Sequence, residues 1–364
     1  MYYNLARSLN KSLLSSVVIR THKVEGYIRV VSSLLIFRVY RKIEMEIHVD
    51  TSKEETQKFL SKLGWIEDET VQAITKAGEG NMNVVLRITT DTRSFILKQS
   101  RSYVQKYPDI PAPIERIDVE AKFYEALQAS NVSAHLPKVI NYHNNLHLLM
   151  MEDLGQVEDL TSIYSSRVVS EETISKLITI AHRTHNAEVG ADFPPNLELR
   201  QLNHQHIFVL PFLRDNGFAL DDVQLGLQKV AAAYQDDEKL SATIHNLGEE
   251  YLSTGTQLVH GDYYPGSWMT IDDKLYVLDP EFAHIGQKEF DLGVMGAHIM
   301  MSTHDVDSIN KIMQLYPDQV SEKKVHQYAG VEIMRRLIGL AQLPLDRSLE
   351  EKAHLLEVAK NWIL

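Results

Sequence analysis

The chain has 364 residues, of which 44% are hydrophobic and 24% charged, and its formal net charge is −12. This composition is ordinary for a globular protein, and the length is sufficient for two domains or two lobes. The absence of cysteine excludes disulfides, thiolate metal sites and a cysteine nucleophile, and the acidic balance argues against a general nucleic-acid-binding surface.

The first 44 residues differ in charge from the rest of the chain. Residues 1–44 contain eight basic and two acidic residues, a net +6, which leaves −18 for residues 45–364. A basic, serine-containing N-terminus is typical of an organellar transit segment. Alternatively, Met45 is the functional start and residues 1–44 are an extension of the gene model. No apolar run is long enough to span a bilayer, so we expect no membrane association and a cytoplasmic body.

The pattern up to residue 151 predicts a small β-rich lobe. Hydrophobic spacing, β-rich runs and turn residues are the signals used. In chain order we expect a helix at 53–63, a glycine-containing turn at 78–83, a hairpin at 83–99, a helix at 113–130 and two strands within 138–155.

The pattern after residue 155 is mainly helical. Two short strands are expected, one in 257–269 and one in 274–282. The predicted helices are 170–188, 220–234, 236–252, 291–302, 305–314, 321–341 and 348–362. The chain therefore reads as a β-rich lobe, a hinge and an α-rich lobe.

Lys98 ends an apolar strand, where a lone ammonium is costly unless a carboxylate or phosphate pairs with it. Glu120 is the candidate partner, because it lies on the apolar face of the 113–130 helix, between Ile117 and Tyr124. A strand lysine paired with a helix glutamate behind a glycine turn holds the ATP phosphates in kinases. Taken singly, a solvated edge-strand lysine is the more common case.

Asp262 lies in the stretch HGDYYPGS and is followed five residues later by Ser267. In the kinase catalytic loop the base aspartate is followed at the same distance by a metal-binding asparagine. Ser267 would be a weaker, neutral oxygen ligand in that position. We expect His260 to orient the backbone of this loop and not to act as a base.

Asp279 and Glu281 follow the next apolar strand, seventeen residues after Asp262. Two carboxylates separated by Pro280 can reach one cation, and Mg²⁺ prefers such oxygen ligands. By itself this stretch would be an ordinary polar turn. Asp291 is expected to be the N-cap of the 291–302 helix.

Three motifs together carry a family resemblance: VHGDYYPGSWM at 259–269, VLDPEF at 277–282 and FDLG at 290–293. They resemble the aminoglycoside phosphotransferase and choline kinase-like superfamily, and within it most closely methylthioribose kinase. The resemblance implies an α+β, two-lobed protein kinase-like fold, with a β-rich N-lobe at 45–151 and a larger α-helical C-lobe at 152–364. It further implies ATP- and Mg²⁺-dependent phosphorylation of a hydroxyl of S-methyl-5-thioribose or a similar sugar, in methionine salvage.

The resemblance also implies roles for single residues. Asp262 would accept the proton of the acceptor hydroxyl, and the main chain of MMEDL (150–154) would bind adenine. Implied nucleotide contacts are Gly80, Asn81, Asn83, Lys98, Glu120, Glu152 and Leu154. Implied metal ligands are Ser267, Asp279 and Glu281. Expected substrate contacts are Arg335 and Arg336 and, because they depart from the family pattern, Tyr263, Tyr264 and Trp268.

Two other functions stay open at this point. The same fold acts on other acceptors, such as choline, homoserine, an aminoglycoside or another sugar. A non-catalytic, nucleotide-binding pseudokinase is the second alternative, although the intact Lys98, Asp262, Asp279 and Glu281 argue against it. A small molecule is the expected partner, and the residues leave a homodimer open.

Overall fold

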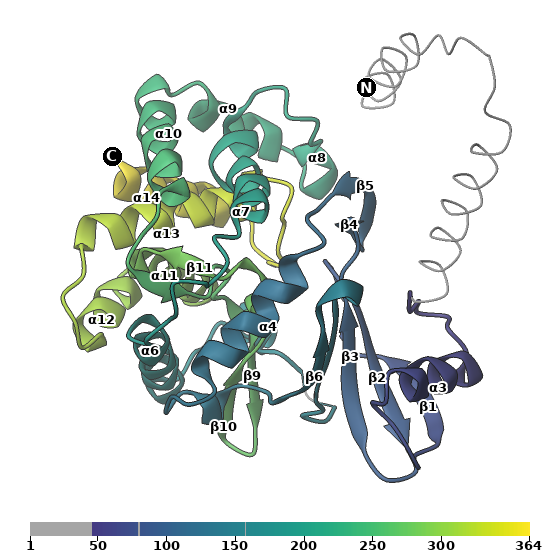
Figure 1. Cartoon of the computed structure of the whole chain (residues 1–364). Coiled ribbons are helices and arrows are strands. Elements are labelled where there is room, and N and C mark those ends of the chain that lie inside the picture. Colours follow the sequence, from purple (N-terminus) through teal and green to yellow (C-terminus); the bar gives the residue numbers. More distant parts are fainter. Residues whose placement is uncertain (1–45, 79–80, 157) are drawn as a thin grey trace, which may run out of the picture. The chain divides into compact units, whose positions relative to one another are not determined.

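The computed structural model describes residues 46–364 apart from 79–80 and 157 (Figure 1). The expectations for residues 1–44 and for Gly80 therefore lie outside the described residues. Residues 47–364 pack as one unit. Within the described part of the chain, the helices are too short or too polar to cross a membrane.

A five-stranded antiparallel sheet with the order β1-β2-β3-β7-β6 forms the N-lobe. Its strands are β1 (Val71–Lys76), β2 (Val84–Thr90), β3 (Ser94–Gln99), β6 (Val139–His143) and β7 (Leu148–Glu152). Helix α3 (Lys53–Lys62) begins with a capping box between Ser52 and Glu55. Leu60 of α3 joins the apolar face of β2 and β3 in one buried cluster. The predicted hairpin and helix are confirmed, whereas β1 was not expected.

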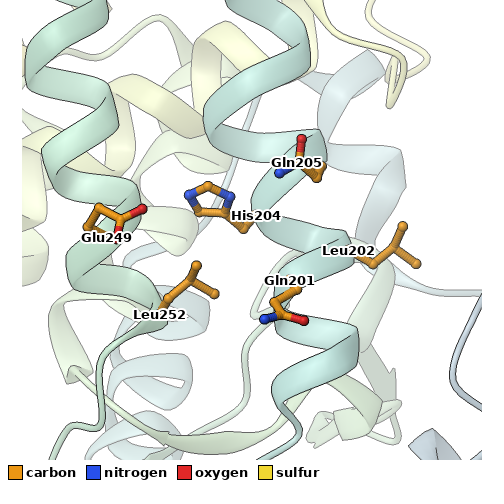
Figure 2. A pocket seen from close by; sticks show the side chains of 6 residues that line it. All are labelled: Gln201, Leu202, His204, Gln205, Glu249 and Leu252. Atoms are coloured by element: carbon orange, nitrogen blue, oxygen red, sulfur yellow. The ribbon is translucent and has the colours of Figure 1, made fainter.

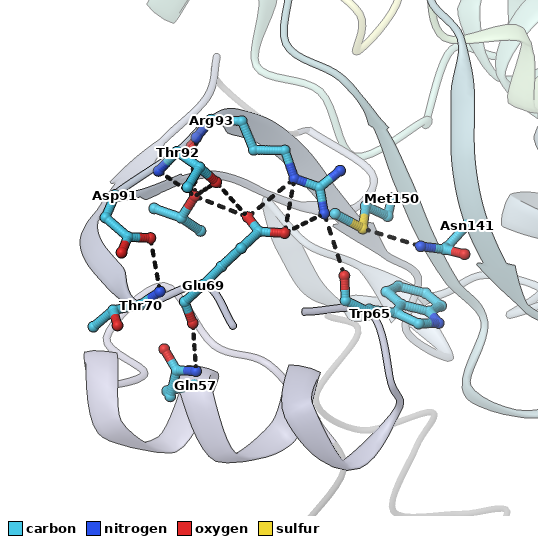
Figure 3. Close-up of polar contacts among 10 residues, drawn as sticks. Gln57, Trp65, Glu69, Thr70, Asp91, Thr92, Arg93, Asn141 and Met150 are labelled. Atoms are coloured by element: carbon cyan, nitrogen blue, oxygen red, sulfur yellow. Dashed lines mark hydrogen bonds and ion pairs between the residues drawn. The ribbon is translucent and has the colours of Figure 1, made fainter. Parts of the chain in front are cut away.

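A polar cluster fixes the turn between β2 and β3 (Figure 3). Glu69 accepts hydrogen bonds from Arg93, with the shortest at 2.7 Å, and from the Thr90 hydroxyl at 2.9 Å. Arg93 lowers the pKa of Glu69. Gln57 of α3 donates to the Glu69 carbonyl at 3.0 Å, so the cluster joins the hairpin to the helix beside it.

Helix α4 (Arg116–Leu127) connects the two lobes. It contacts β6 and β7 in the N-lobe and the short helical turn Pro280–Phe282 in the C-lobe. Before it lies a small hairpin that the sequence did not predict, formed by β4 (Tyr103–Val104) and β5 (Tyr107–Pro111). Because α4 is buried on most sides, its polar residues must find partners inside the protein.

The C-lobe consists mainly of helices: α5 (Ile163–Ser166), α6 (Glu171–His185), α7 (Leu197–His204), α8 (Leu220–Val223), α9 (Leu227–Gln235), α10 (Glu238–Leu252), α11 (Lys288–Thr303), α12 (Ser308–Leu315), α13 (Glu322–Ile338) and α14 (Leu349–Ile363). The almost wholly buried α11 and α13 pack against each other, and α14 packs on α13. A Cβ on Gly293 of α11 would lie 2.6 Å from the Tyr328 Cβ of α13. Gly293 therefore permits the close approach of these two helices.

Some predicted elements of the C-lobe differ from the observed ones. The expected helix at 220–234 is two helices, α8 and α9, because Gly226 has φ 91° and interrupts it. Helix α7 was not predicted. Four short strands replace the expected two: β8 (Gln257–Val259) pairs with β11 (His284–Gly286), and β9 (Trp268–Ile271) pairs with β10 (Lys274–Val277).

Candidate functional site

The loop after β8 carries Asp262 and is held by His260 from within. His260 Nε2 lies 2.9 Å from the Leu278 carbonyl oxygen, so it donates there, and Nδ1 accepts from the Asp262 amide at 3.3 Å. Both ring nitrogens are therefore occupied by backbone groups. The histidine orients the loop, as its position in the sequence predicted.

Asp291 holds the same loop from helix α11. Its carboxylate accepts from the backbone amides of His260 and Gly261, at 2.7 and 2.9 Å, and lies 3.1 Å from His185 Nε2. Burial would raise the pKa of Asp291, but the hydrogen bond with His185 holds it below its ordinary value. The expectation that Asp291 is an N-cap was wrong, because the helix begins at Lys288 with Gln287 as the capping residue. Asp291 lies within the first turn of the helix, and its carboxylate fixes the loop.

Asp262 lies partly exposed beside a fixed cation. Its side chain is 22% exposed, and Oδ1 lies 3.6 Å from Nη2 of Arg336. Burial raises the pKa of Asp262, and the arginine opposes that rise. The hydroxyl of Ser267 donates to the Asp262 carbonyl at 3.0 Å, so Ser267 braces the loop backbone. The carboxylate itself has an open side toward solvent.

Arg335 and Arg336 are both buried and share one counter-ion, Glu332. Nη1 of Arg335 lies 3.0 Å from Glu332, and Nε of Arg336 lies 2.6 Å from it. His298 Nε2 contacts the same carboxylate at 3.0 Å, and its Nδ1 contacts the Tyr164 hydroxyl at 2.7 Å. Sequence reasoning missed Glu332, although its spacing of three and four residues from the arginines on a helix was the available signal.

The three aromatic residues near Asp262 have different environments. Tyr263 is 2% exposed and donates its hydroxyl to the Leu177 carbonyl at 2.8 Å, and the 1% exposed Trp268 packs edge-on against it. These two residues fill the core, which corrects the expectation that they contact a substrate. Tyr264 differs, because the Arg336 guanidinium lies 4.9 Å from its ring centre. A side chain at Gly266 would collide with the Tyr264 hydroxyl.

Lys98 joins β3 to both α4 and the C-lobe. Its Nζ lies 2.6 Å from Glu120 and 2.7 Å from Asp279. Burial alone would lower the pKa of Lys98, but Asp279 and Glu120 raise it above its ordinary value. Burial raises the pKa of Glu120 to about 8, against the influence of Lys98. The structure thus brings together the lysine and glutamate that the sequence paired.

Asp279 and Glu281 lie on the two sides of Pro280 with different surroundings. The Asp279 side chain is 58% exposed, and its backbone has φ 60°. Glu281 is 6% exposed, and its Oε2 accepts from the Asn83 side chain at 2.8 Å. The described residues contain no group of three acidic, histidine or cysteine side chains arranged for a metal.

The hinge after β7 has one amide that is already occupied. The Glu152 amide donates to the Lys138 carbonyl at 2.8 Å, so only its carbonyl can meet a ligand, whereas Leu154 follows outside the strand. Arg87 of β2, which sequence reasoning missed, clamps this segment with bonds of 2.8 and 3.0 Å to Asp153. The arginine keeps the pKa of Asp153 low despite partial burial.

The turn before β2 has one asparagine that faces out and one that faces in. Asn81 is exposed, and its carbonyl accepts from the Lys106 amide at 2.9 Å. Asn83 is 2% exposed and points to Glu281. The two asparagines of the expected phosphate turn therefore have different surroundings.

A cavity of about 460 Å³ lies between α7 and α10, outside this group of residues (Figure 2). It is lined by Gln201, Leu202, His204, Gln205, Glu249 and Leu252. The sequence pointed to none of these residues. The polar groups described above converge elsewhere, around Lys98, Asp262 and Asp279.

Comparisons with known proteins point to one family of enzymes. The model of the phosphotransferase enzyme family matches residues 73–318. A methylthioribose kinase from Geobacillus sp. (strain WCH70) is 24% identical over 352 residues, which cover 83% of this chain and 86% of the relative. Methylthioribose kinase 1 from Oryza sativa subsp. japonica is 24% identical over 275 residues, covering 70% and 60%.

Among solved structures, the choline kinase LicA of Streptococcus pneumoniae in complex with AMP superimposes with a TM-score of 0.52. The two chains are 15% identical, and the match covers 85% of this chain and 98% of LicA. At this identity the likeness concerns the fold. It confirms the two-lobed, α+β kinase-like architecture with an antiparallel sheet in the N-lobe.

Proposed function

The chain belongs to the phosphotransferase enzyme family, and from this membership we propose that it transfers the γ-phosphate of ATP to a hydroxyl of a small sugar related to S-methyl-5-thioribose. The N-lobe, 45–151, would bind the nucleotide, and the C-lobe, 152–364, would supply the base and the acceptor site. A cytoplasmic location and a homodimer stay predictions.

The observation that carries the proposal is the junction of Lys98 with Glu120 and Asp279. One ammonium from the N-lobe contacts a carboxylate of α4 and a carboxylate of the C-lobe, at 2.6 and 2.7 Å. A lysine held in this way offers a fixed positive charge to ATP phosphates, and phosphoryl transfer depends mainly on positioning and charge compensation. The carbonyl of Glu152 and the amide of Leu154 are suited to the adenine edge.

The donor set fits Mg²⁺ rather than a metal held by the protein alone. Mg²⁺ is usually bound by one or two carboxylates together with phosphates and water. Asp279 has an exposed carboxylate, and Glu281 has one oxygen that is not engaged by Asn83. These two side chains would hold the cation, and Ser267 would lie next to it. When bound, the cation would supply positive charge that neutralises the phosphates.

Asp262 is suited to accept the proton of the acceptor hydroxyl. Its carboxylate is open on one side, and the loop backbone is fixed by His260 and Asp291. Since burial raises the pKa of Asp262, the carboxylate is a better base than an exposed one. Arg336, at 3.6 Å, adds positive charge where phosphoryl charge develops.

The two buried arginines favour a neutral acceptor rich in hydroxyl groups. A cationic acceptor such as choline would meet Arg336 next to the base. The named methylthioribose kinases among the relatives agree with a neutral thiosugar. Homoserine, aminoglycosides and other sugars are the alternative acceptors in the test. If the protein is a pseudokinase, none of the acceptors will be phosphorylated.

The experiment is an acceptor panel with ATP and Mg²⁺, containing S-methyl-5-thioribose, ribose, choline, homoserine and an aminoglycoside. We expect phosphorylation of the thiosugar with the highest kcat/KM. Asp262→Asn should lower kcat by roughly 10²–10⁴ while nucleotide binding remains. Faster turnover of choline would contradict the substrate assignment, and an unchanged kcat in the variant would contradict the role of Asp262.

A further inference from the structure

Glu281 depends on Asn83 and Arg116 for its orientation. The carboxylate is buried, and its Oε2 lies 2.8 Å from the Asn83 Nδ2 and 3.5 Å from Nε of Arg116. A buried carboxylate needs such partners, because burial alone disfavours its charge. The contacts come from two segments almost 200 and more than 160 residues away in the chain, as the numbering shows.

Arg116 is wholly buried and uses all five of its N–H groups inside the protein. Nε donates to Asn83 Oδ1 at 2.9 Å. The remaining four bonds go to backbone carbonyls: Arg101 at 2.6 Å, Pro113 at 2.7 Å, Met82 at 2.6 Å and Tyr103 at 3.2 Å. A guanidinium has five donors and no acceptor, so none is left for a phosphate. Arg116 ties the turn before β2 to the β4–β5 hairpin and the start of α4.

The neighbours of Asn83 fix which way its amide points. The guanidinium can only donate and the ionised carboxylate can only accept. The Asn83 oxygen must therefore face Arg116, and its nitrogen must face Glu281. The amide oxygen and one amide N–H are engaged in this way, and Asn83 is only 2% exposed, so this side chain is held toward Glu281.

We infer that Asn83, locked by Arg116, is a positioning residue that aims the free oxygen of Glu281 at the Mg²⁺ of the bound nucleotide. This inference rests on the proposed function. By this inference, the turn before β2 in the N-lobe orients a metal ligand in the C-lobe, in addition to any contact that its backbone makes with phosphate. Partners that orient metal ligands in this way are worth about 10–100-fold in metal affinity.

The test is calorimetric titration with a non-hydrolysable ATP analogue, in the presence of Mg²⁺ and in EDTA. Asn83→Ala removes the amide and should weaken binding of the Mg²⁺ complex by about 10–100-fold, with metal-free binding unchanged. Equal weakening in both conditions would show that Asn83 contacts the nucleotide, and unchanged binding in both would show that it does not position Glu281. Either result overturns the inference.

Two further variants keep the result interpretable. Asn83→Asp conserves the volume and the bond from Arg116, but it sets a carboxylate against Glu281, so it should also lose Mg²⁺-dependent binding. Asn141→Ala in β6, whose amide contacts Met150 Sδ at 3.5 Å, is the matched control and should bind like the parent. If the parent chain shows no Mg²⁺-dependent binding, the proposed function fails. If it does and both Asn83 variants match it, only this inference fails.

Discussion

Replacing Glu332 with glutamine should destabilise the protein strongly without changing the volume of the side chain. The carboxylate is 1% exposed and is the shared counter-ion of Arg335 and Arg336, with His298 as a third partner. An amide offers one oxygen to three donors and turns its own N–H groups toward a guanidinium. Removing one member of a buried ion pair costs about 3–5 kcal/mol, because the remaining charge stays buried.

That loss is a large part of a total stability of about 5–15 kcal/mol, so it is easy to measure. Urea unfolding followed by tryptophan fluorescence should show a lower midpoint for Glu332→Gln. Glu322→Gln, at the exposed start of the same helix, is the control and should lose under about 1 kcal/mol. A similarly small loss for Glu332→Gln would refute the view that this carboxylate neutralises both arginines.

The difference in the free energy of unfolding between the parent chain and Glu332→Gln should decrease at acidic pH. Burial would raise the pKa of Glu332, but Arg335 and Arg336 hold it well below its ordinary value. A carboxyl group whose pKa is lowered by folding stabilises the protein at pH values above its pKa in the unfolded chain, about 4.3. This stabilisation is lost as the pH falls toward the pKa of the group in the folded chain. The advantage of the parent over Glu332→Gln should therefore be constant from pH 7 to 5 and shrink below about pH 4.

Two other perturbations test the Gly261 position of the Asp262 loop and the buried His284 of the neighbouring strand β11. Gly261 has φ 81°, and a Cβ there would lie 2.3 Å from the Phe282 carbonyl oxygen. Gly261→Ala should therefore cost about 2–4 kcal/mol in urea unfolding, and a loss below 1 kcal/mol would contradict the close approach. Burial lowers the pKa of His284 to about 4. Above the pKa of histidine in the unfolded chain, about 6.5, the imidazole is neutral in both states and its burial costs nothing in charge. As the pH falls from about 6.5 toward about 4, only the unfolded chain binds the proton, so the folded state becomes less stable. Between pH 7 and 5 the parent should lose about 2 kcal/mol more than His284→Gln, whereas parallel pH curves would show that His284 does not titrate in this way.

Residues that stand out within a short stretch of the sequence could be predicted. Lys98 and Glu120 each stood out as a charge in an apolar segment, and a buried charge must be paired. The Asp262 loop and the Asp279–Glu281 pair were recognised because their short spacings are independent of the rest of the chain. The loop function of His260 followed from the same motif.

The missed residues have roles that depend on contacts between distant segments. Arg116 reads as an ordinary polar residue at a helix start, yet its partners come from the turn, the hairpin and, through Glu281, the C-lobe. The contacts of Asn83 with Arg116 and Glu281 were missed because both partners lie far from it in the sequence. Tyr263 and Trp268 were taken for substrate residues, since sequence position next to a base does not reveal which face of the loop is packed. The short strands β9 and β11 were missed because strands of three or four residues carry little periodicity.

The close contact of α11 and α13 also links the apolar core to the reacting groups. Helix α11 carries Asp291, which anchors the loop of Asp262, and α13 carries Arg336. The distance of 3.6 Å between Arg336 and Asp262 therefore depends on the spacing of the two helices, and Gly293 and Tyr328 are in close contact where these helices meet. Gly293 lies only two residues from Asp291 on α11, so a methyl group added at this helix contact would change the spacing of base and cation through the packing of the core.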